Sequence, residues 1–269
     1  MNRFEQRGKV VLITGATSGI GEACAIAFAR QGARLALLGR NGTRLSKVVQ
    51  SAAEISKGEG GSAEGFELDL RQTDQIPATV DEIKRKIGPV DVLLNNAAYA
   101  VAGLIEDCPV DQYKRNFEVN FFAVLSLIQA VLPGMKVKRA GQIINVSSGV
   151  GKRALPGFSS YCATKFALNG LTESLRLEVK PHGIDVLLIS PGRVSSDFHN
   201  RIEFYGRWRM RLPPMQMRSP DQIAELILDA SRKRMREATV WGPGLAGYHL
   251  NYWSPRLVDF LLAKKYPTG

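Results

Sequence analysis

Ser148, Tyr161 and Lys165 place a hydroxyl, a phenol and an ammonium group within one short stretch of the chain. Tyr161 and Lys165 are four positions apart, so on a helix they share one face. An ammonium group beside a phenol favours the phenolate and is expected to lower the phenol pKa from its usual value of about 10. With Ser148 opposite, these groups predict a site that polarises a carbonyl and moves a proton to or from its oxygen. The alternative is a surface Tyr–Lys pair beside a serine-rich turn, because Tyr-x-x-x-Lys alone is common.

Short apolar runs alternate with helical patterns along the whole sequence. The runs expected to be strands are residues 9–14, 34–39, 64–68, 90–95, 142–146, 184–189 and 238–241. Between them we expect helices from the glycine-rich turn to about 31, from 41 or 43 to 57, over 73–87, two within 110–133, from the Tyr161 region to 180, and over 220–233. Continuous apolar strands alternating with helices predict a doubly wound α/β fold, that is, a Rossmann-type parallel sheet of about seven strands. We expect one domain over residues 1–269.

Composition describes an ordinary globular protein and excludes several other classes. Hydrophobic residues make up 45% of the chain and charged residues 23%, and no unbroken apolar run reaches the roughly 18 residues of a membrane span. The first eight residues are polar, without the apolar core of a secretory signal. The cysteines have no Cys-x-x-Cys spacing and the histidines lie in separate loops, so we expect a cytoplasmic protein without a metal site. These residues are Cys24, Cys108, Cys162, His182, His199 and His249.

A glycine-rich turn directly follows the first predicted strand. Gly15, Gly19 and Gly21 open the next helix, a context in which backbone N–H groups approach a pyrophosphate at a helix N-terminus. Thr17, Ser18 and Ile20 belong to the same turn and are expected to bind cofactor with it. The alternative is that these glycines only permit close packing of strand and helix.

The end of the second predicted strand bears on the choice of cofactor. Rossmann sites often carry a carboxylate here that binds a ribose 2′-hydroxyl, but this chain has Gly39 followed by Arg40. Arg40 could stack on adenine or pair with a 2′-phosphate, and Arg44 could add to this. We therefore expect NADP(H) in preference to NAD(H); the alternative is that Arg40 is a solvated loop residue.

Together these segments resemble the classical short-chain dehydrogenase/reductase family over residues 8–242. The glycine turn is similar to the family's cofactor loop, and the resemblance implies further cofactor contacts at Asp69, Leu70, Asn96, Ala97, Pro191, Gly192, Val194 and Ser196, besides Tyr161 and Lys165. Two positions depart mildly from the family pattern: Ala98 replaces the last glycine of Asn-Asn-Ala-Gly, and Ser196 stands in place of a threonine.

The resemblance also implies a catalytic tetrad of Asn120, Ser148, Tyr161 and Lys165. Ser148, thirteen residues before Tyr161, matches the catalytic serine better than Ser147 does. In the family mechanism the serine binds the substrate oxygen, and the tyrosine exchanges a proton with it. The lysine binds the nicotinamide ribose and lowers the tyrosine pKa, while the asparagine supports a water that leads to solvent.

Two segments bear on the substrate and partners. Residues 193–218, where the family usually has its substrate lid, combine an apolar set with a basic one: Phe198, Phe204, Tyr205, Trp208, Met210, Met215 and Met217 with Arg201, Arg207, Arg209, Arg211 and Arg218. This composition suits a lipophilic small-molecule substrate, with the arginines meeting an acidic group on it or anionic lipid headgroups. The runs 155–161 and 189–192 resemble the branch of the family that contains steroid, retinoid and long-chain keto-lipid reductases, which implies a substrate of that type. A solvated lid is the alternative.

The second segment is a C-terminal extension at about 243–269. Its apolar helix after Ser254-Pro255 has basic ends and is too short to span a bilayer; it could pack on the protein, cover the cleft, join a subunit interface or lie in a membrane interface. The net charge is +11, and residues 191–269 hold 13 Lys/Arg against 7 Asp/Glu. Despite this charge we expect no nucleic-acid binding, because no recognisable module is present.

Other functions remain open beside the lipophilic carbonyl reductase. A 3-oxoacyl thioester reductase is the enzymatic alternative, and a non-catalytic NADP(H)-sensing regulator is the alternative from another class. An intact tetrad argues against the sensor. The resemblance further implies a homodimer or homotetramer, formed through the helices that carry Asn120 and Tyr161.

Overall fold

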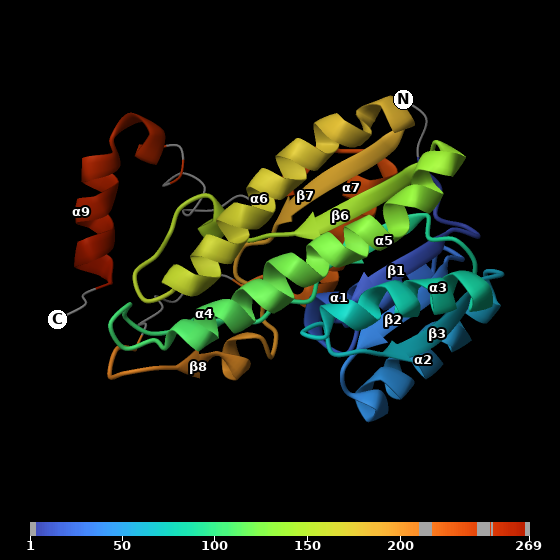
Figure 1. The fold of residues 1–269 in the computed structure, drawn as a ribbon, viewed down its shortest axis with the longest axis horizontal. Coiled ribbons are helices and arrows are strands. Elements are labelled where there is room, and N and C mark those ends of the chain that lie inside the picture. The colour runs from blue at the N-terminus through green and yellow to red at the C-terminus, as the bar shows by residue number, and fades with distance from the viewer. Residues whose placement is uncertain (1–3, 210–216, 241–247, 249, 267–269) are drawn as a thin grey trace.

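The computed structural model describes residues 4–209, 217–240, 248 and 250–266. Its main sheet has seven strands in the order β3-β2-β1-β4-β6-β7-β9, all paired in parallel (Figure 1). The strands are β1 Val10–Thr14, β2 Arg34–Gly39, β3 Ser62–Glu67, β4 Val92–Asn95, β6 Gly141–Val146, β7 Ile184–Ser190 and β9 Glu237–Thr239. The predicted Rossmann-type fold is confirmed.

Helices cover both faces of this sheet. They are α1 Gly19–Ala29, α2 Gly42–Lys57, α3 Ile76–Lys86, α4 Val110–Phe117, α5 Ala123–Lys138, α6 Ser159–Val179, α7 Pro220–Arg232 and α9 Pro255–Lys265. One core cluster joins α1, α2 and α7 to the sheet, and the other joins α3, α5 and α6 to its opposite face. Successive β1 residues Val10 to Ile13 alternate between the two clusters, which is why the strands are continuously apolar.

The strand order reverses direction between β1 and β4. In an open parallel sheet, ligands bind at the carboxyl ends of the strands where the order reverses. The loops after β1, β4, β6 and β7 carry the glycine turn, Asn96, Ser148 and Pro191, so the topology brings the predicted cofactor and catalytic residues to one edge of the sheet.

Two helix N-termini are capped by side chains. The side chain of Asn41 accepts a hydrogen bond from Arg44 N at 2.9 Å at the start of α2. Ser219 and Gln222 form a reciprocal capping box at the start of α7, where Pro220 occupies the first helical position and needs no N–H partner.

The prediction of two helices ending near Pro133 is wrong. The chain is helical from Val110 to Lys138, with a π-helical turn at Glu118–Phe122 that joins α4 to α5. Pro133 lies inside α5 on its exposed side, and the carbonyl it cannot bond belongs to exposed Gln129. Water can bond that carbonyl, so the proline does not end the helix.

The same helical stretch bears on membrane topology. By length and composition alone, Val110–Lys138 is apolar enough to cross a membrane, although the sequence has no unbroken apolar run of that length. In the structure α5 packs against the sheet and contributes Leu127, Ile128 and Val131 to a core cluster, as the covering helix of a globular fold does.

Two segments lie outside the main sheet. The two-residue strands β5 Val101–Ala102 and β8 Glu203–Phe204 pair in parallel and tie the lid segment to the chain after β4. In Figure 1, α9 stands beside the loop that precedes α6, away from the sheet. Of the expected lid, residues 210–216 lie outside the described residues, as do 241–247, 249 and 267–269 of the extension and the end of the last expected strand.

Candidate active site

A cavity of about 1330 Å³ opens at the carboxyl edge of the sheet. Sites for one small molecule usually measure about 300–1,000 Å³, so this cavity has room for a dinucleotide and a second molecule. Every site residue predicted from the sequence lines it except Gly21 and Asn120.

The glycine turn after β1 is shaped by backbone constraints. Gly15 and Gly19 have φ angles of +65° and +59°, which are strained for residues with a side chain. A Cβ at Gly21 would lie 2.2 Å from the Gly15 carbonyl oxygen, and a Cβ at Gly39 would lie 2.3 Å from Thr17 Cγ2. Gly21 therefore contributes close packing rather than a cavity wall, while Gly15 and Gly19 shape a concave turn at the N-terminus of α1 that fits a pyrophosphate.

Thr14 joins the ends of β1 and β4, a structural role that was not predicted from the sequence. Its buried hydroxyl accepts hydrogen bonds from the backbone N–H groups of Asn96 and Ala97, each at 3.0 Å. The Asn96 side chain donates in turn to Thr14 O at 3.0 Å. These bonds fix the turn after β4 against the glycine turn.

The predicted adenosine end of the cavity is lined by Asp69, Arg71 and Arg40. Arg71 donates to the Asp69 carboxylate through its backbone N–H and its guanidinium, with Nη2 to Oδ2 at 2.5 Å. These hydrogen bonds hold the pKa of Asp69 below its ordinary value, and Arg40 adds to the effect by its charge. Arg71 was not predicted as a site residue; Arg40 is exposed and lines the cavity as expected.

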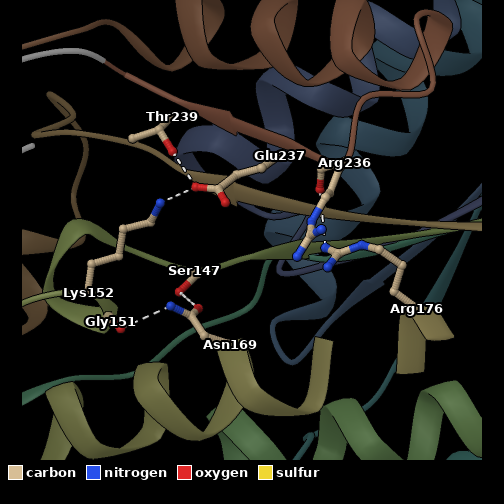
Figure 2. Close-up of polar contacts among 8 residues, drawn as sticks. All are labelled: Ser147, Gly151, Lys152, Asn169, Arg176, Arg236, Glu237 and Thr239. Atoms are coloured by element: carbon tan, nitrogen blue, oxygen red, sulfur yellow. Dashed lines mark hydrogen bonds and ion pairs between the residues drawn. The ribbon is translucent and has the colours of Figure 1, made fainter. Parts of the chain in front are cut away.

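The two serines after β6 face different partners. Ser148 faces the Tyr161 hydroxyl across the cavity wall, whereas Ser147 donates to Asn169 Oδ1 at 2.6 Å. Asn169 Nδ2 donates to Gly151 O at 2.9 Å, so one α6 side chain clamps the loop on either side of Ser148 (Figure 2). The choice of Ser148 over Ser147 agrees with this geometry. Asn169 was missed, although it lies one helical turn after Lys165.

A second clamp on this loop comes from β9. Lys152 forms an ion pair with Glu237, which also accepts a hydrogen bond from Thr239 Oγ1 at 2.8 Å (Figure 2). Lys152 and Thr239 both line the cavity. The loop that carries Ser148 is therefore held from both the α6 side and the β9 side.

Tyr161 and Lys165 share the face of α6 that borders the cavity, as their spacing predicts. Lys165 Nζ lies 5.6 Å from the Tyr161 ring centroid and donates to Val146 O at 2.9 Å. Burial lowers the pKa of Lys165 to about 8. Burial also raises the pKa of Tyr161, against a smaller lowering by the Ser148 hydrogen bond. This direction is opposite to the one predicted, because desolvation of the phenolate outweighs the charge of an ammonium group that bonds a backbone carbonyl.

Asn120 lies in the π-helical turn and is buried away from the cavity wall. Its side chain accepts from Tyr99 N at 2.9 Å and donates to Tyr99 O at 2.8 Å and Thr164 Oγ1 at 3.1 Å. Both polar atoms of the amide fasten the chain after β4 to the helix layer, and the water-supporting role that the resemblance implies stays a prediction.

The lid segment closes over the cavity from β7. Phe198 packs against Tyr161 with ring centroids 5.7 Å apart. Arg201 Nη1 donates to Ser18 Oγ of the glycine turn at 3.2 Å, and its Nη2 pairs with Asp197 at 3.2 Å. Further along, Trp208 packs edge-on against Phe158, and the absence of a side chain at Gly157 makes room for its ring. Arg201 places a lid cation beside the predicted pyrophosphate site, a role that the sequence did not indicate.

The extension forms the outer wall of the cavity. Val258, Leu262, Lys265 and Tyr266 line it, and Arg153 pairs with Asp259 of α9. Among the positions left open by the sequence, the structure places α9 on the protein at the cleft.

The cavity fits a nicotinamide dinucleotide. Buried Ser190 Oγ, at the end of β7 on the cavity wall, has no hydrogen-bond partner among the described residues, so a polar ligand group there would satisfy it. No group of three His, Cys, Asp or Glu side chains suited to a metal occurs in the described part of the chain.

Comparisons with known proteins agree with this architecture. A family model described as short chain dehydrogenase matches residues 9–204. The dehydrogenase/reductase SDR family member 7B of Bos taurus is 38% identical over 267 residues, which cover 96% of this chain and 82% of that protein. The protein of the same name from Xenopus tropicalis is 33% identical over 246 residues, covering 89% of this chain and 80% of its own.

Solved structures show the same likeness. A short-chain dehydrogenase/reductase from Burkholderia phymatum in complex with NAD has a TM-score of 0.82 at 25% identity, covering 94% of this chain and 96% of its own. An alcohol dehydrogenase from Thermococcus sibiricus complexed with 5-hydroxy-NADP has a TM-score of 0.75 at 26% identity, covering 87% of this chain and 96% of its own. On the strength of the family match and these identities, the chain belongs to the short-chain dehydrogenase/reductase family of oxidoreductases.

Proposed function

We propose that the protein interconverts a carbonyl and an alcohol by direct hydride transfer with NADP(H), with Tyr161 as general acid and base. The observation that carries this proposal is the Tyr161 hydroxyl on the wall of the dinucleotide-sized cavity, with Ser148 on the same wall and Lys165 one helical turn away. A substrate oxygen between Ser148 and Tyr161 meets two hydroxyl groups, one that orients it and one that exchanges its proton.

Each residue has a distinct task in this scheme. The bound nicotinamide supplies or accepts the hydride at the carbonyl carbon. During reduction, Ser148 donates a hydrogen bond to the substrate oxygen and Tyr161 gives that oxygen its proton; oxidation reverses both steps. Lys165 supplies positive charge that stabilises the Tyr161 phenolate left behind. Phe198 of the lid covers the tyrosine and excludes water.

Replacement of Tyr161 by phenylalanine tests the mechanism. Because a general acid contributes about 10²–10⁴-fold, we expect Tyr161→Phe to lower kcat/KM for carbonyl reduction by that factor. Cofactor affinity, followed by NADPH fluorescence, should stay within about twofold, because the ring and Lys165 remain. Reduction at a near wild-type rate would refute Tyr161 as the proton donor.

The preference for NADP(H) rests on basic side chains around the predicted adenosine end of the cavity. Arg40 is exposed on the wall, and a neighbouring hollow of about 230 Å³ is bordered by Arg44 and Lys47 together with Glu22 and Asp197. A side chain at position 39 would displace Thr17, because a Cβ there would lie 2.3 Å from Thr17 Cγ2. We expect Arg40→Asp to shift the ratio of kcat/KM values toward NADH by at least about tenfold, which is about 1.4 kcal/mol. An unchanged ratio would contradict the assignment.

A lipophilic substrate agrees with the apolar part of the cavity wall, which includes Leu155, Phe158, Phe198, Val258 and Leu262. Steroid-, retinoid- and keto-lipid-like carbonyls are therefore the first class to test in an NADPH-consumption assay. A 3-oxoacyl thioester reductase is the second candidate, supported by Lys152, Arg153 and Lys265 on the same wall. Turnover of short thioesters without turnover of hydrophobic ketones would favour that candidate.

The non-catalytic alternative is an NADP(H)-sensing regulator. The loop that carries Ser148 is held from two sides, which fixes Ser148 beside Tyr161. Cofactor sensing alone does not require this arrangement. NADPH binding without turnover on a broad panel of aldehydes and ketones would support the sensor.

We propose that the chain is a single domain and assembles as a homodimer or homotetramer. We also propose that it works in the cytoplasm, with peripheral membrane contact. The helical layer of α4 to α6 exposes Val110, Phe122, Phe166 and Leu177, side chains that subunit contacts would cover. Light scattering coupled to size exclusion measures the assembly, and a monomer at micromolar concentration would contradict it. Separation of cell extracts into soluble and membrane fractions tests the location.

A further inference from the structure

The segment around α9 has two apolar faces with different surroundings. One face, with Val258 and Leu262, lines the cavity. The other exposes Leu257, Phe260 and Leu261 at 45%, 65% and 47% of their surface. Spacings of three and four residues place these three side chains on one side of the helix, next to the cavity-lining side.

The helical residues 250–253 before α9 extend the exposed apolar surface. Tyr252 and Trp253 are 81% and 83% exposed, and their rings pack edge-to-face with centroids 5.4 Å apart. We call Tyr252, Trp253, Leu257, Phe260 and Leu261 the α9 patch. Tyrosine and tryptophan favour the boundary between lipid headgroups and acyl chains.

The charges around the α9 patch are mostly positive. Residues 250–266 carry Arg256, Lys264 and Lys265 and a single carboxylate, Asp259. That carboxylate is paired with Arg153 of the loop before α6, and the three cations are exposed, Lys265 at the edge of the cavity. An apolar helix face rimmed by cations is complementary to a lipid surface with negative headgroups.

We infer that the α9 patch docks on an anionic membrane surface and sets the mouth of the substrate cavity against the lipid. The mouth of the cavity then lies next to the lipid in which a lipophilic substrate dissolves. Helix α9 stands between the cavity and the lipid. The substrate part of this inference rests on the proposed function, whereas the docking part depends only on the surface.

Vesicle flotation of the full-length protein tests the docking. We expect binding to vesicles of phosphatidylcholine with phosphatidylserine and little binding to phosphatidylcholine alone. The double variant Phe260→Ser, Leu261→Ser should weaken binding by about tenfold or more, since it removes two large apolar side chains from the contact. Neither residue lines the cavity, so NADPH oxidation with a water-soluble ketone should not change.

Val137→Ser is the matched control, because Val137 is 87% exposed at the far end of α5. It should leave vesicle binding unchanged. Absence of wild-type binding, equal binding by the double variant, or a double variant that dissociates a dimer on size exclusion would each overturn the inference; the last outcome would make the α9 patch a subunit interface. Vesicle binding without turnover of any carbonyl would refute the proposed function and leave the docking intact.

Discussion

The two sides of the cavity are held together by different kinds of contact. On the cofactor side, the Thr14 hydroxyl accepts hydrogen bonds from two backbone N–H groups of the turn after β4, and there is no space for a Cβ at Gly21. On the substrate side, the lid and α9 are attached by side chains: the Phe158–Trp208 ring contact and the Arg153–Asp259 ion pair. Backbone pairing among the described residues of that side is limited to the two residue pairs of β5 and β8 and an isolated bridge between Val194 and Arg218.

This difference shows which part of the molecule can change its chemistry. A pyrophosphate is recognised by backbone N–H groups, so its site tolerates few substitutions. Side-chain contacts on the substrate side can be exchanged without disturbing the sheet, because loops on a rigid scaffold carry specificity. Substitutions on the cofactor side should therefore abolish binding of the dinucleotide, whereas substitutions on the substrate side should only change the strength of ligand binding.

The largest effect is expected from Gly21→Ala on the cofactor side. Its Cβ would meet the Gly15 carbonyl oxygen and Asn96 Nδ2, which must move and distort the turn. We expect a destabilisation of about 1–3 kcal/mol and at least about a hundredfold loss of NADPH affinity, or about 2.7 kcal/mol, measured by fluorescence titration. Gly170→Ala is the control, because nothing lies within 4 Å of its Cβ position. Equal NADPH affinities for the two variants would remove the distinction between the sides.

Lys165 lies where the two sides meet, and its burial gives a pH signature. Its pKa falls from an ordinary 10.5 to about 8 in the folded chain, so between these values the unfolded chain binds more protons. The free energy of unfolding should therefore rise with pH in that window, by up to roughly 3 kcal/mol. Urea denaturation at pH 7.5 and 10.5, compared with Lys165→Met, isolates this rise; an equal pH dependence in both proteins would contradict it.

Asn169→Ala should affect the chemical step more than cofactor binding. It leaves Ser147 Oγ and Gly151 O without their partner and loosens the loop that positions Ser148. A loss of about 1–2 kcal/mol corresponds to a fall in kcat of about five- to thirtyfold, with NADPH affinity unchanged. Asn169→Asp keeps the acceptor for Ser147 and loses the donor to Gly151, so its kcat should lie between those of the wild type and Asn169→Ala. A fall in NADPH affinity with normal kcat would show that the clamp serves the cofactor instead.

The smallest effect is expected from Arg201→Ala in the lid. Its guanidinium is partly exposed beside Ser18, where water and salt weaken its attraction to a pyrophosphate. We expect about a three- to tenfold loss of NADPH affinity, about 0.7–1.4 kcal/mol, that shrinks as salt is raised. Arg207→Ala, at another exposed arginine of the lid, should have no such effect. An equal loss in both variants would show a general charge effect rather than a contact at the glycine turn.

The sequence by itself determined the sheet, the glycine turn and the face shared by Tyr161 and Lys165. These features are local: apolar runs fix strands, glycines fix the turn, and a spacing of four fixes a helix face. The order of the motifs was sufficient for the family. The spacing of thirteen residues to Tyr161 favoured Ser148 over Ser147 as the catalytic serine.

Only the tertiary structure decided how those features are supported. Arg201 and Ser18 are 183 positions apart, and Arg153 and Asp259 are 106 apart, so no local pattern relates them. The π-helical turn directs the Asn120 amide to Tyr99, and burial around Tyr161 reverses the expected direction of its pKa. Both depend on which distant groups surround a side chain, and that follows from packing rather than from spacing along the chain.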